Sequence, residues 1–83
     1  MKRILIIEDE KFTRDNLAII LRMEGYEAHT AADGRAGIET ARRERPDLIL
    51  CDVMMPELDG HAVLAALRAA PATVLAFEKL SGE

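Results

Sequence analysis

Residues 47–52 read DLILCD, an apolar run that ends in the carboxylate of Asp52. A second run of this kind, RILII over residues 3–7, stops at the acidic triplet Glu8-Asp9-Glu10. Continuous rather than alternating hydrophobicity is typical of strands that are covered on both faces, as in a parallel sheet. The two runs therefore predict two buried parallel strands, each of which ends in acidic side chains.

The residues between these runs predict a helix, a strand and a second helix. Apolar residues recur at helical spacing over residues 12–24, and Gly25 is suited to end that helix in a left-handed conformation. Residues 26–31 (YEAHTA) predict a weaker strand. The second helix is expected to run to about residue 45, with Asp33 as its N-cap, and Gly37 inside it costs roughly 1 kcal/mol relative to Ala.

A third helix is expected after the second apolar run, from about residue 61 to residue 69, and Pro71 ends it. The element order βαβαβα is the signature of a doubly wound parallel α/β sheet with right-handed crossovers. We assign residues 1–71 to this unit. Residues 72–83 form a divergent tail, which contains a possible partial fourth strand at residues 74–77.

Composition limits the class of protein. The chain has 83 residues, 49% hydrophobic and 31% charged, which suits a single globular domain. Its net charge of -4 argues against nucleic acid as a direct partner. Cys51 is the only cysteine and lies in an apolar run, so we expect a small buried hydrophobe. With neither a signal peptide nor an apolar stretch that could span a membrane in this sequence, we expect a cytoplasmic location.

Three carboxylates are expected to meet at one edge of the sheet. If the strand order is 2-1-3, the first and third strands are neighbours, and Glu8 and Asp9 lie beside Asp52. Ligands of open α/β sheets bind beyond the carboxyl ends of the strands, where the strand order reverses. A divalent cation such as Mg²⁺, which prefers hard oxygen ligands, would relieve the repulsion among these carboxylates. The alternative is that Asp9 or Glu10 only favours the positive end of the first helix.

With a cation present, Asp52 is placed to attack a phosphoryl group and form an aspartyl-phosphate. A metal-dependent phosphohydrolase with an aspartyl nucleophile is a less favoured alternative. Such enzymes usually carry a second Asp two residues after the nucleophile, where this chain has Met54. We therefore do not expect an enzyme that acts on external substrates.

The sequence resembles the receiver domain of two-component response regulators. The matching text is RILIIEDE at residues 3–10, the stretch from AADG to PELDG at residues 31–60, and LRAA at residues 67–70. The resemblance runs from Lys2 to about Pro71 and implies a flavodoxin-like (CheY-like) sheet of order 2-1-3, here incomplete. It also implies a place in a phosphorelay, with a histidine kinase or phosphotransfer protein as the partner.

The resemblance carries roles over to individual positions. Asp52 would be the phosphoacceptor, and Mg²⁺ would be held by Glu8, Asp9, Asp52 and the backbone carbonyl of Met54. Glu8 stands where many members have Asp. The loop that leads into the third helix would be shaped by Pro56, Asp59 and Gly60.

Beyond Pro71 the resemblance is lost. Receivers continue with a strand that ends in Thr or Ser and a strand that ends in a Lys, and these two residues couple phosphorylation to a change of surface. Ser81 lies roughly where the hydroxyl would fall, and Lys79 is no replacement for the lysine. A switch-deficient fragment that serves as an interaction or assembly module is therefore the main alternative. A sheet that stops after its third strand would expose an apolar edge, so we expect a homo-oligomer formed through that edge.

Overall fold

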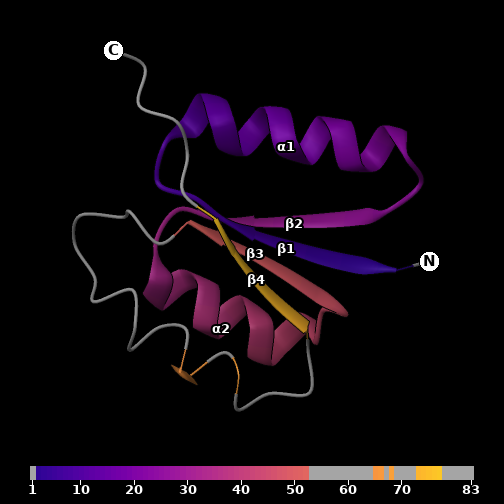
Figure 1. Cartoon of the computed structure of the whole chain (residues 1–83). Coiled ribbons are helices and arrows are strands. Elements are labelled where there is room, and N and C mark those ends of the chain that lie inside the picture. The colour runs from indigo at the N-terminus through magenta and orange to yellow at the C-terminus, as the bar shows by residue number, and fades with distance from the viewer. Residues whose placement is uncertain (1, 53–64, 67, 69–72, 78–83) are drawn as a thin grey trace.

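The computed structural model describes residues 2–52, 65, 66, 68 and 73–77. Its elements in chain order are β1 (Arg3–Ile7), α1 (Lys11–Met23), β2 (Glu27–Ala31), α2 (Gly34–Glu44), β3 (Leu48–Asp52) and β4 (Thr73–Phe77) (Figure 1). Each of the first five elements begins and ends within one residue of the bounds predicted from the sequence. Neither α1 nor α2, the helices with described bounds, is long and apolar enough to cross a bilayer.

The four strands form one parallel sheet in the order β2-β1-β3-β4. The predicted fold class and the predicted order 2-1-3 are therefore confirmed. One expectation was wrong, because the outer edge of β3 is not open. β4 pairs with β3 over its whole length, with Leu48 opposite Thr73 and Asp52 opposite Phe77.

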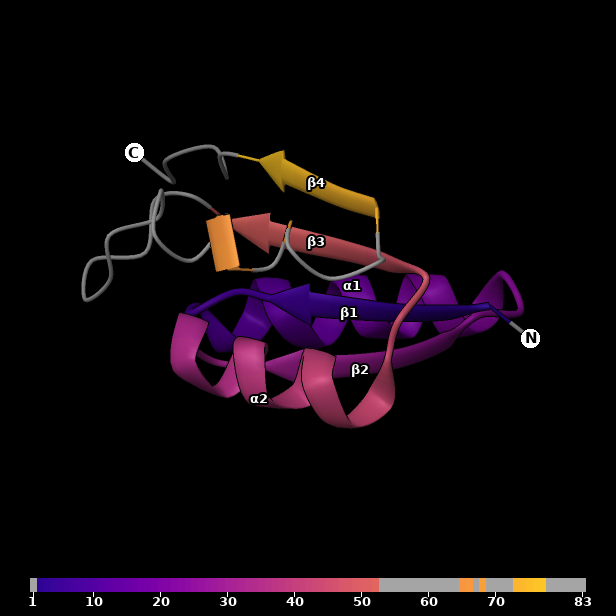
Figure 2. The ribbon, with the colours of Figure 1, turned by 90° about the horizontal axis from the view of Figure 1, so that it is seen from below.

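The two helices cover opposite faces of the sheet, as Figure 2 shows with α2 in front of the strands and α1 behind them. Alternate residues of β1 serve the two faces, since side chains alternate along a strand. Leu5 and Ile7 pack with Ala41 of α2, whereas Ile6 packs with Ala18 of α1. β1 is thus buried from both sides, which explains why its sequence reads as an unbroken apolar run.

The predicted ends of α1 and α2 are confirmed, and the structure shows that Glu10 is the N-cap of α1. The side chain of Glu10 accepts hydrogen bonds from the backbone amides of Phe12 and Thr13 at the start of α1. Asp33 caps α2 by accepting from the amide of Ala36. Gly25 follows α1 with φ +91°, a left-handed conformation that disfavours side chains.

Gly37 allows α2 to lie close to β1. A Cβ atom placed on Gly37 would lie 2.8 Å from Cγ1 of Ile7, a separation that van der Waals contact does not permit. The cost of a glycine inside a helix is therefore offset by close packing against the strand that leads to Glu8.

Candidate functional site

Glu8 and Asp52 lie level with each other at the carboxyl end of the sheet. Asp52 is the last residue of β3, and Glu8 follows the last residue of β1. Because Ile7 pairs with Cys51 in the parallel register, the next residue on each strand is Glu8 on one and Asp52 on the other. The register of two neighbouring strands thus brings together residues that are 44 positions apart.

Asp9 completes the group. One carboxylate oxygen from each of Glu8, Asp9 and Asp52 lies within 4.8 Å of the other two. Glu8 and Asp52 are fully buried, and Asp9 is exposed. The group therefore has two acidic side chains inside the protein and a third that is exposed to solvent.

Backbone contacts hold this turn in place. The amide of Glu8 donates to the carbonyl of Ala31 (3.1 Å), and Oε2 of Glu8 accepts from the amide of Glu10 (2.7 Å). The guanidinium of Arg14 donates to the carbonyl oxygens of Glu8 (3.1 Å) and Asp9 (3.5 Å). Glu10 itself caps α1. Of the two residues that the sequence offered as partners for the start of the first helix, Glu10 is therefore the one that caps it. Glu8 and Asp9 belong to the acidic group with Asp52.

The donor set fits a hard divalent cation. Three carboxylates within 4.8 Å supply only oxygen ligands, and Mg²⁺ takes one or two carboxylates and keeps several waters. Their like charges repel one another, and burial of two of them reduces the screening by water. The exposed side of Asp9 leaves room for the water ligands that Mg²⁺ retains. We conclude that the donor chemistry and the burial suit Mg²⁺.

Cys51, next to Asp52, takes no part in this group. Its side chain is buried and packs on the α2 face of the sheet with Ile7 and Ile49, as the sequence predicted for a small hydrophobe. Burial, with a smaller contribution from the charge of Asp52, raises the pKa of the Cys51 thiol to about 11. The thiol stays protonated at neutral pH and is a poor nucleophile.

Several predicted site residues lie outside the residues that the structure describes. The third helix is seen only in Ala65, Ala66 and Arg68, which are helical and exposed. The residues not described include the predicted metal ligand, the loop-shaping residues and the hydroxyl candidate, which are Met54, Pro56, Asp59, Gly60 and Ser81.

Sequence reasoning missed a second group of ligand-type side chains. Glu27, His29 and Glu44 also bring one ligand atom each to within 4.8 Å of the others. The ring of His29 contacts the carboxylates of Glu27 and Glu44. The available signal was the spacing of Glu27 and His29, which places both on one face of a strand. The contribution of Glu44 depends on how α2 packs and could not be seen in the pattern.

The fold and the acidic group define a class, the doubly wound parallel α/β proteins with a carboxylate site at the sheet's carboxyl end. The sequence model of one protein family, the response regulator receiver domain, matches residues 4–77. This match reaches past Pro71 and includes β4. The chain belongs to this family.

Two curated relatives are transcriptional regulatory proteins. PdtaR, a transcriptional regulatory protein of Mycobacterium tuberculosis, is 45% identical over 78 residues, which are 89% of this chain and 38% of PdtaR. PhoP, the alkaline phosphatase synthesis transcriptional regulatory protein of Bacillus subtilis, is 43% identical over 67 residues, 81% of this chain and 28% of PhoP. The chain thus spans well under half the length of these curated relatives.

Solved structures show the same fold. The response regulator TrrA of Thermotoga maritima in complex with Mg²⁺ and BeF is 36% identical with a TM-score of 0.77, and the match covers 83% of this chain and 60% of TrrA. TrrA in a complex with the histidine kinase ThkA gives a TM-score of 0.86 at 32% identity, with 98% of this chain and 72% of that chain covered.

Proposed function

We propose that this chain is the phosphoacceptor module of a two-component phosphorelay, in which Asp52 accepts a phosphoryl group from a phosphohistidine. The observation that carries the proposal is the meeting of Glu8, Asp9 and Asp52 within 4.8 Å at the carboxyl end of the sheet. TrrA, which is similar over most of this chain, is seen both with Mg²⁺-BeF and with a histidine kinase. These likenesses support a phosphohistidine on a kinase or phosphotransfer protein as the donor.

We assign a separate role to each residue of the site. Glu8 and Asp9 would hold Mg²⁺ together with one oxygen of Asp52 and the backbone carbonyl of Met54. Bound there, Mg²⁺ neutralises the charge that develops on the phosphoryl oxygens. The other oxygen of Asp52 attacks phosphorus as the bond from phosphorus to the histidine nitrogen breaks, which leaves an aspartyl-phosphate on β3. Pro56, Asp59 and Gly60 would shape the loop after the site. Nothing in this arrangement calls for turnover of an external substrate, so we propose a signalling module rather than an enzyme.

A labelling experiment tests this function. The chain is incubated with Mg²⁺ and acetyl phosphate, and the mass increase of one phosphoryl group is followed by mass spectrometry. We expect the label in the native chain and its loss in Asp52→Asn. The matched control is Asp47→Asn, which removes a carboxylate one residue before the other end of β3, where Asp47 accepts from the amide of Arg3 (2.9 Å).

The control variant should be labelled like the native chain. A label that persists in Asp52→Asn, or the same modest loss in both variants, would contradict Asp52 as the acceptor. Many phosphate molecules released per chain would instead favour the phosphohydrolase.

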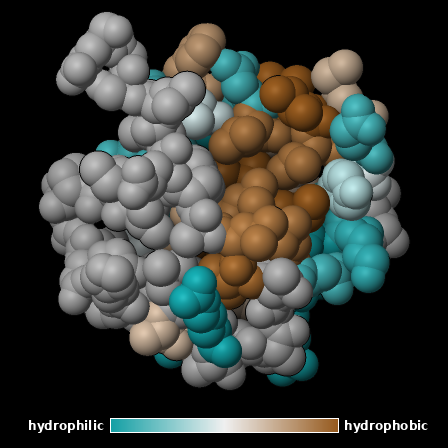
Figure 3. All heavy atoms as spheres, viewed as in Figure 1, coloured by the Kyte–Doolittle hydropathy of each residue, from teal (hydrophilic) through white to brown (hydrophobic). Residues whose placement is uncertain are grey.

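A second candidate, an assembly module that lacks the switch, is favoured by one observation. Leu75 of β4 is 52% exposed, and Leu50, which lies opposite Leu75 on β3, is half-buried. Figure 3 shows hydrophobic side chains gathered on this side of the molecule. Within the described part of the sheet, β4 is the end strand and pairs only with β3, so a strand of a second copy could add to its other edge. The proposed oligomer edge therefore moves from β3 to β4.

Light scattering separates the two candidates. An assembly module should form a dimer at micromolar concentration that Leu75→Lys dissociates, whether or not Asp52 is phosphorylated. If the chain is a monomer and is labelled at Asp52, only the receiver function remains as a candidate. Retention of the dimer in Leu75→Lys would contradict the β4 edge as the interface.

A further inference from the structure

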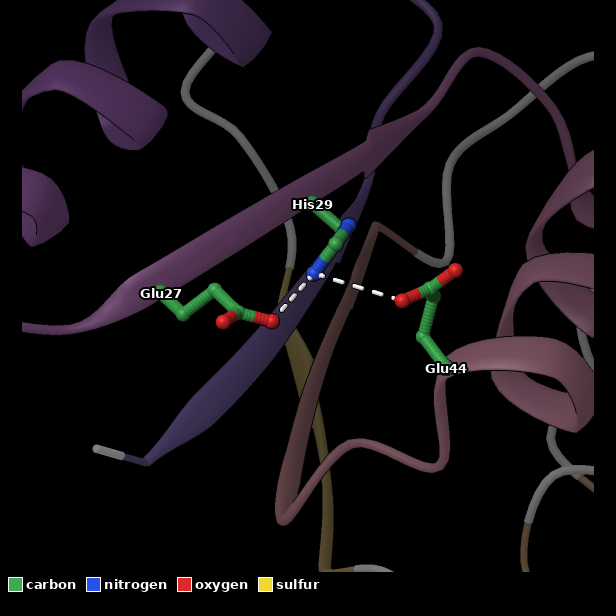
Figure 4. A group of neighbouring side chains, drawn as sticks. All are labelled: Glu27, His29 and Glu44. Carbon is green, nitrogen blue, oxygen red and sulfur yellow. Dashed lines mark hydrogen bonds and ion pairs between the residues drawn. The ribbon is translucent and has the colours of Figure 1, made fainter.

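Three ligand-type side chains meet on the α2 face of the sheet, away from the carboxyl end. Nε2 of His29 lies 2.7 Å from Oε2 of Glu27 and 3.7 Å from Oε1 of Glu44. Figure 4 shows the imidazole between the two carboxylates, with Glu27 and His29 on β2 and Glu44 on α2. One ligand atom from each lies within 4.8 Å of the other two. The separation matches what three ligands of one cation require after small side-chain movements.

The backbone under this group is fixed by the fold. Glu27 and His29 are two residues apart on one strand, so both side chains leave the same face. Glu44 is the last residue of α2, which packs on that face. The guanidinium of Arg3 donates to the carbonyl of Glu44 (2.9 Å), which ties the end of the helix to β1. The three ligands thus come from elements whose positions are set by the core.

The group is also open to solvent. The side chains of Glu27, His29 and Glu44 are 38%, 29% and 26% exposed. A cation bound by them would keep water in its remaining positions, as zinc sites with three protein ligands do.

We propose that Glu27, His29 and Glu44 form a binding site for a divalent transition-metal ion such as Zn²⁺, separate from the acidic group at Asp52. An imidazole nitrogen with two carboxylate oxygens suits Zn²⁺ and its neighbours in the first row, whereas Mg²⁺ prefers oxygen ligands alone. On binding, Nε2 of His29 releases the proton that it donates to Glu27 to solvent and gives its lone pair to the metal, and the neutral imidazole then carries its ring proton on Nδ1.

Arginines occupy part of the group when metal is absent. Nε of Arg3 lies 2.9 Å from Oε2 of Glu27, the same oxygen that contacts His29. Nε of Arg43 lies 3.0 Å from Oε2 of Glu44, the oxygen that faces away from His29. A metal ion would therefore share Glu44 with Arg43 but compete with Arg3 for Glu27.

The test is a titration of the 83-residue chain with Zn²⁺ by calorimetry and with Co²⁺ by visible absorbance. The chain carries Asp9→Asn and Asp52→Asn, so that the acidic group cannot supply the signal. We expect one ion per chain, with binding weakened ~10-fold or more by His29→Gln and by Glu44→Gln. The matched control is His61→Gln, at the chain's other histidine.

Each result decides. Loss in His29→Gln and Glu44→Gln but not in His61→Gln supports the site, as does a Zn²⁺-induced shift of the ¹⁵N resonance of His29 Nε2 in the unsubstituted chain. That shift keeps the test decisive if a variant fails to fold by circular dichroism. No binding, binding that all variants retain, or equal loss at both histidines would overturn the site and leave only an ion-pair cluster.

Discussion

The two ends of the sheet differ in how deeply acidic side chains are buried and in which side chains lie next to them. At the carboxyl end, Glu8 and Asp52 are fully buried and lie beside a third carboxylate. On the α2 face toward the amino end, Glu27 and Glu44 are partly exposed and contact Arg3, Arg43 and His29. Carboxylates at the first end lie within 4.8 Å of one another, and those at the second contact cationic or imidazole side chains. Carboxylates this close together and this deeply buried favour a bound cation, as we propose for Mg²⁺.

Asp52→Asn should give the largest effect and the clearest test of this contrast. Without Mg²⁺ we expect the free energy of unfolding of the variant to be about 1–3 kcal/mol higher than that of the native chain. The reason is that the substitution removes one of three like charges in a place where water screens them little. Mg²⁺ should stabilise the native chain and leave the variant unchanged. Urea unfolding with and without Mg²⁺ measures both effects. A variant less stable than the native chain without Mg²⁺ would show that the carboxylates do not repel on balance.

Gly37→Ala tests the packing behind the carboxyl end. The added methyl group would collide with Ile7, and overpacking costs about 1–3 kcal/mol, of which the better helix propensity of Ala returns up to ~1 kcal/mol. We expect a net loss of up to about 2 kcal/mol. Because Ile7 precedes Glu8, the rate of phosphorylation by acetyl phosphate should fall as well. Unchanged stability and an unchanged rate would mean that Ile7 moves aside freely.

Gly25→Ala is the counterpart at the other end. No atom would meet the new methyl group, so the cost comes only from the left-handed φ of +91° and should be about 1 kcal/mol. Thermal unfolding measures it. In contrast to Gly37→Ala, phosphorylation of the folded chain should keep its native rate. A lower rate would show that the two ends are coupled.

Glu27→Gln should give the smallest effect, opposite in sign to that of Asp52→Asn. Loss of the contacts with His29 and Arg3 should lower the melting temperature slightly at neutral pH. The pKa of Glu27 is lowered from 4.5 in the folded state, so its contribution is present above pH 4.5 and is lost as the pH falls through the folded value. The melting temperatures of variant and native chain should therefore converge in acid. A constant difference from pH 7 to pH 3 would contradict the charge contribution.

The fold was readable because its signals are local. Unbroken apolar runs predict the buried strands, and Asp33 and Gly25 mark a helix start and a helix end that the structure confirms. The partial fourth strand was harder to predict, because the letters after residue 77 continue neither a strand pattern nor a helix pattern. Pairing with β3 stabilises this strand, since Thr73–Phe77 pairs with backbone groups at the outer edge of β3.

The sequence by itself determined the elements and the kinds of residue at the strand ends, since periodicity and turn chemistry act over a few neighbouring positions. Only the tertiary structure decided which side chains meet. The parallel register puts Glu8 level with Asp52, and the packing of α2 brings Glu44 to His29 across a gap that no local pattern encodes. Contacts of that kind depend on how layers stack, and stacking is set by the whole core rather than by any one segment.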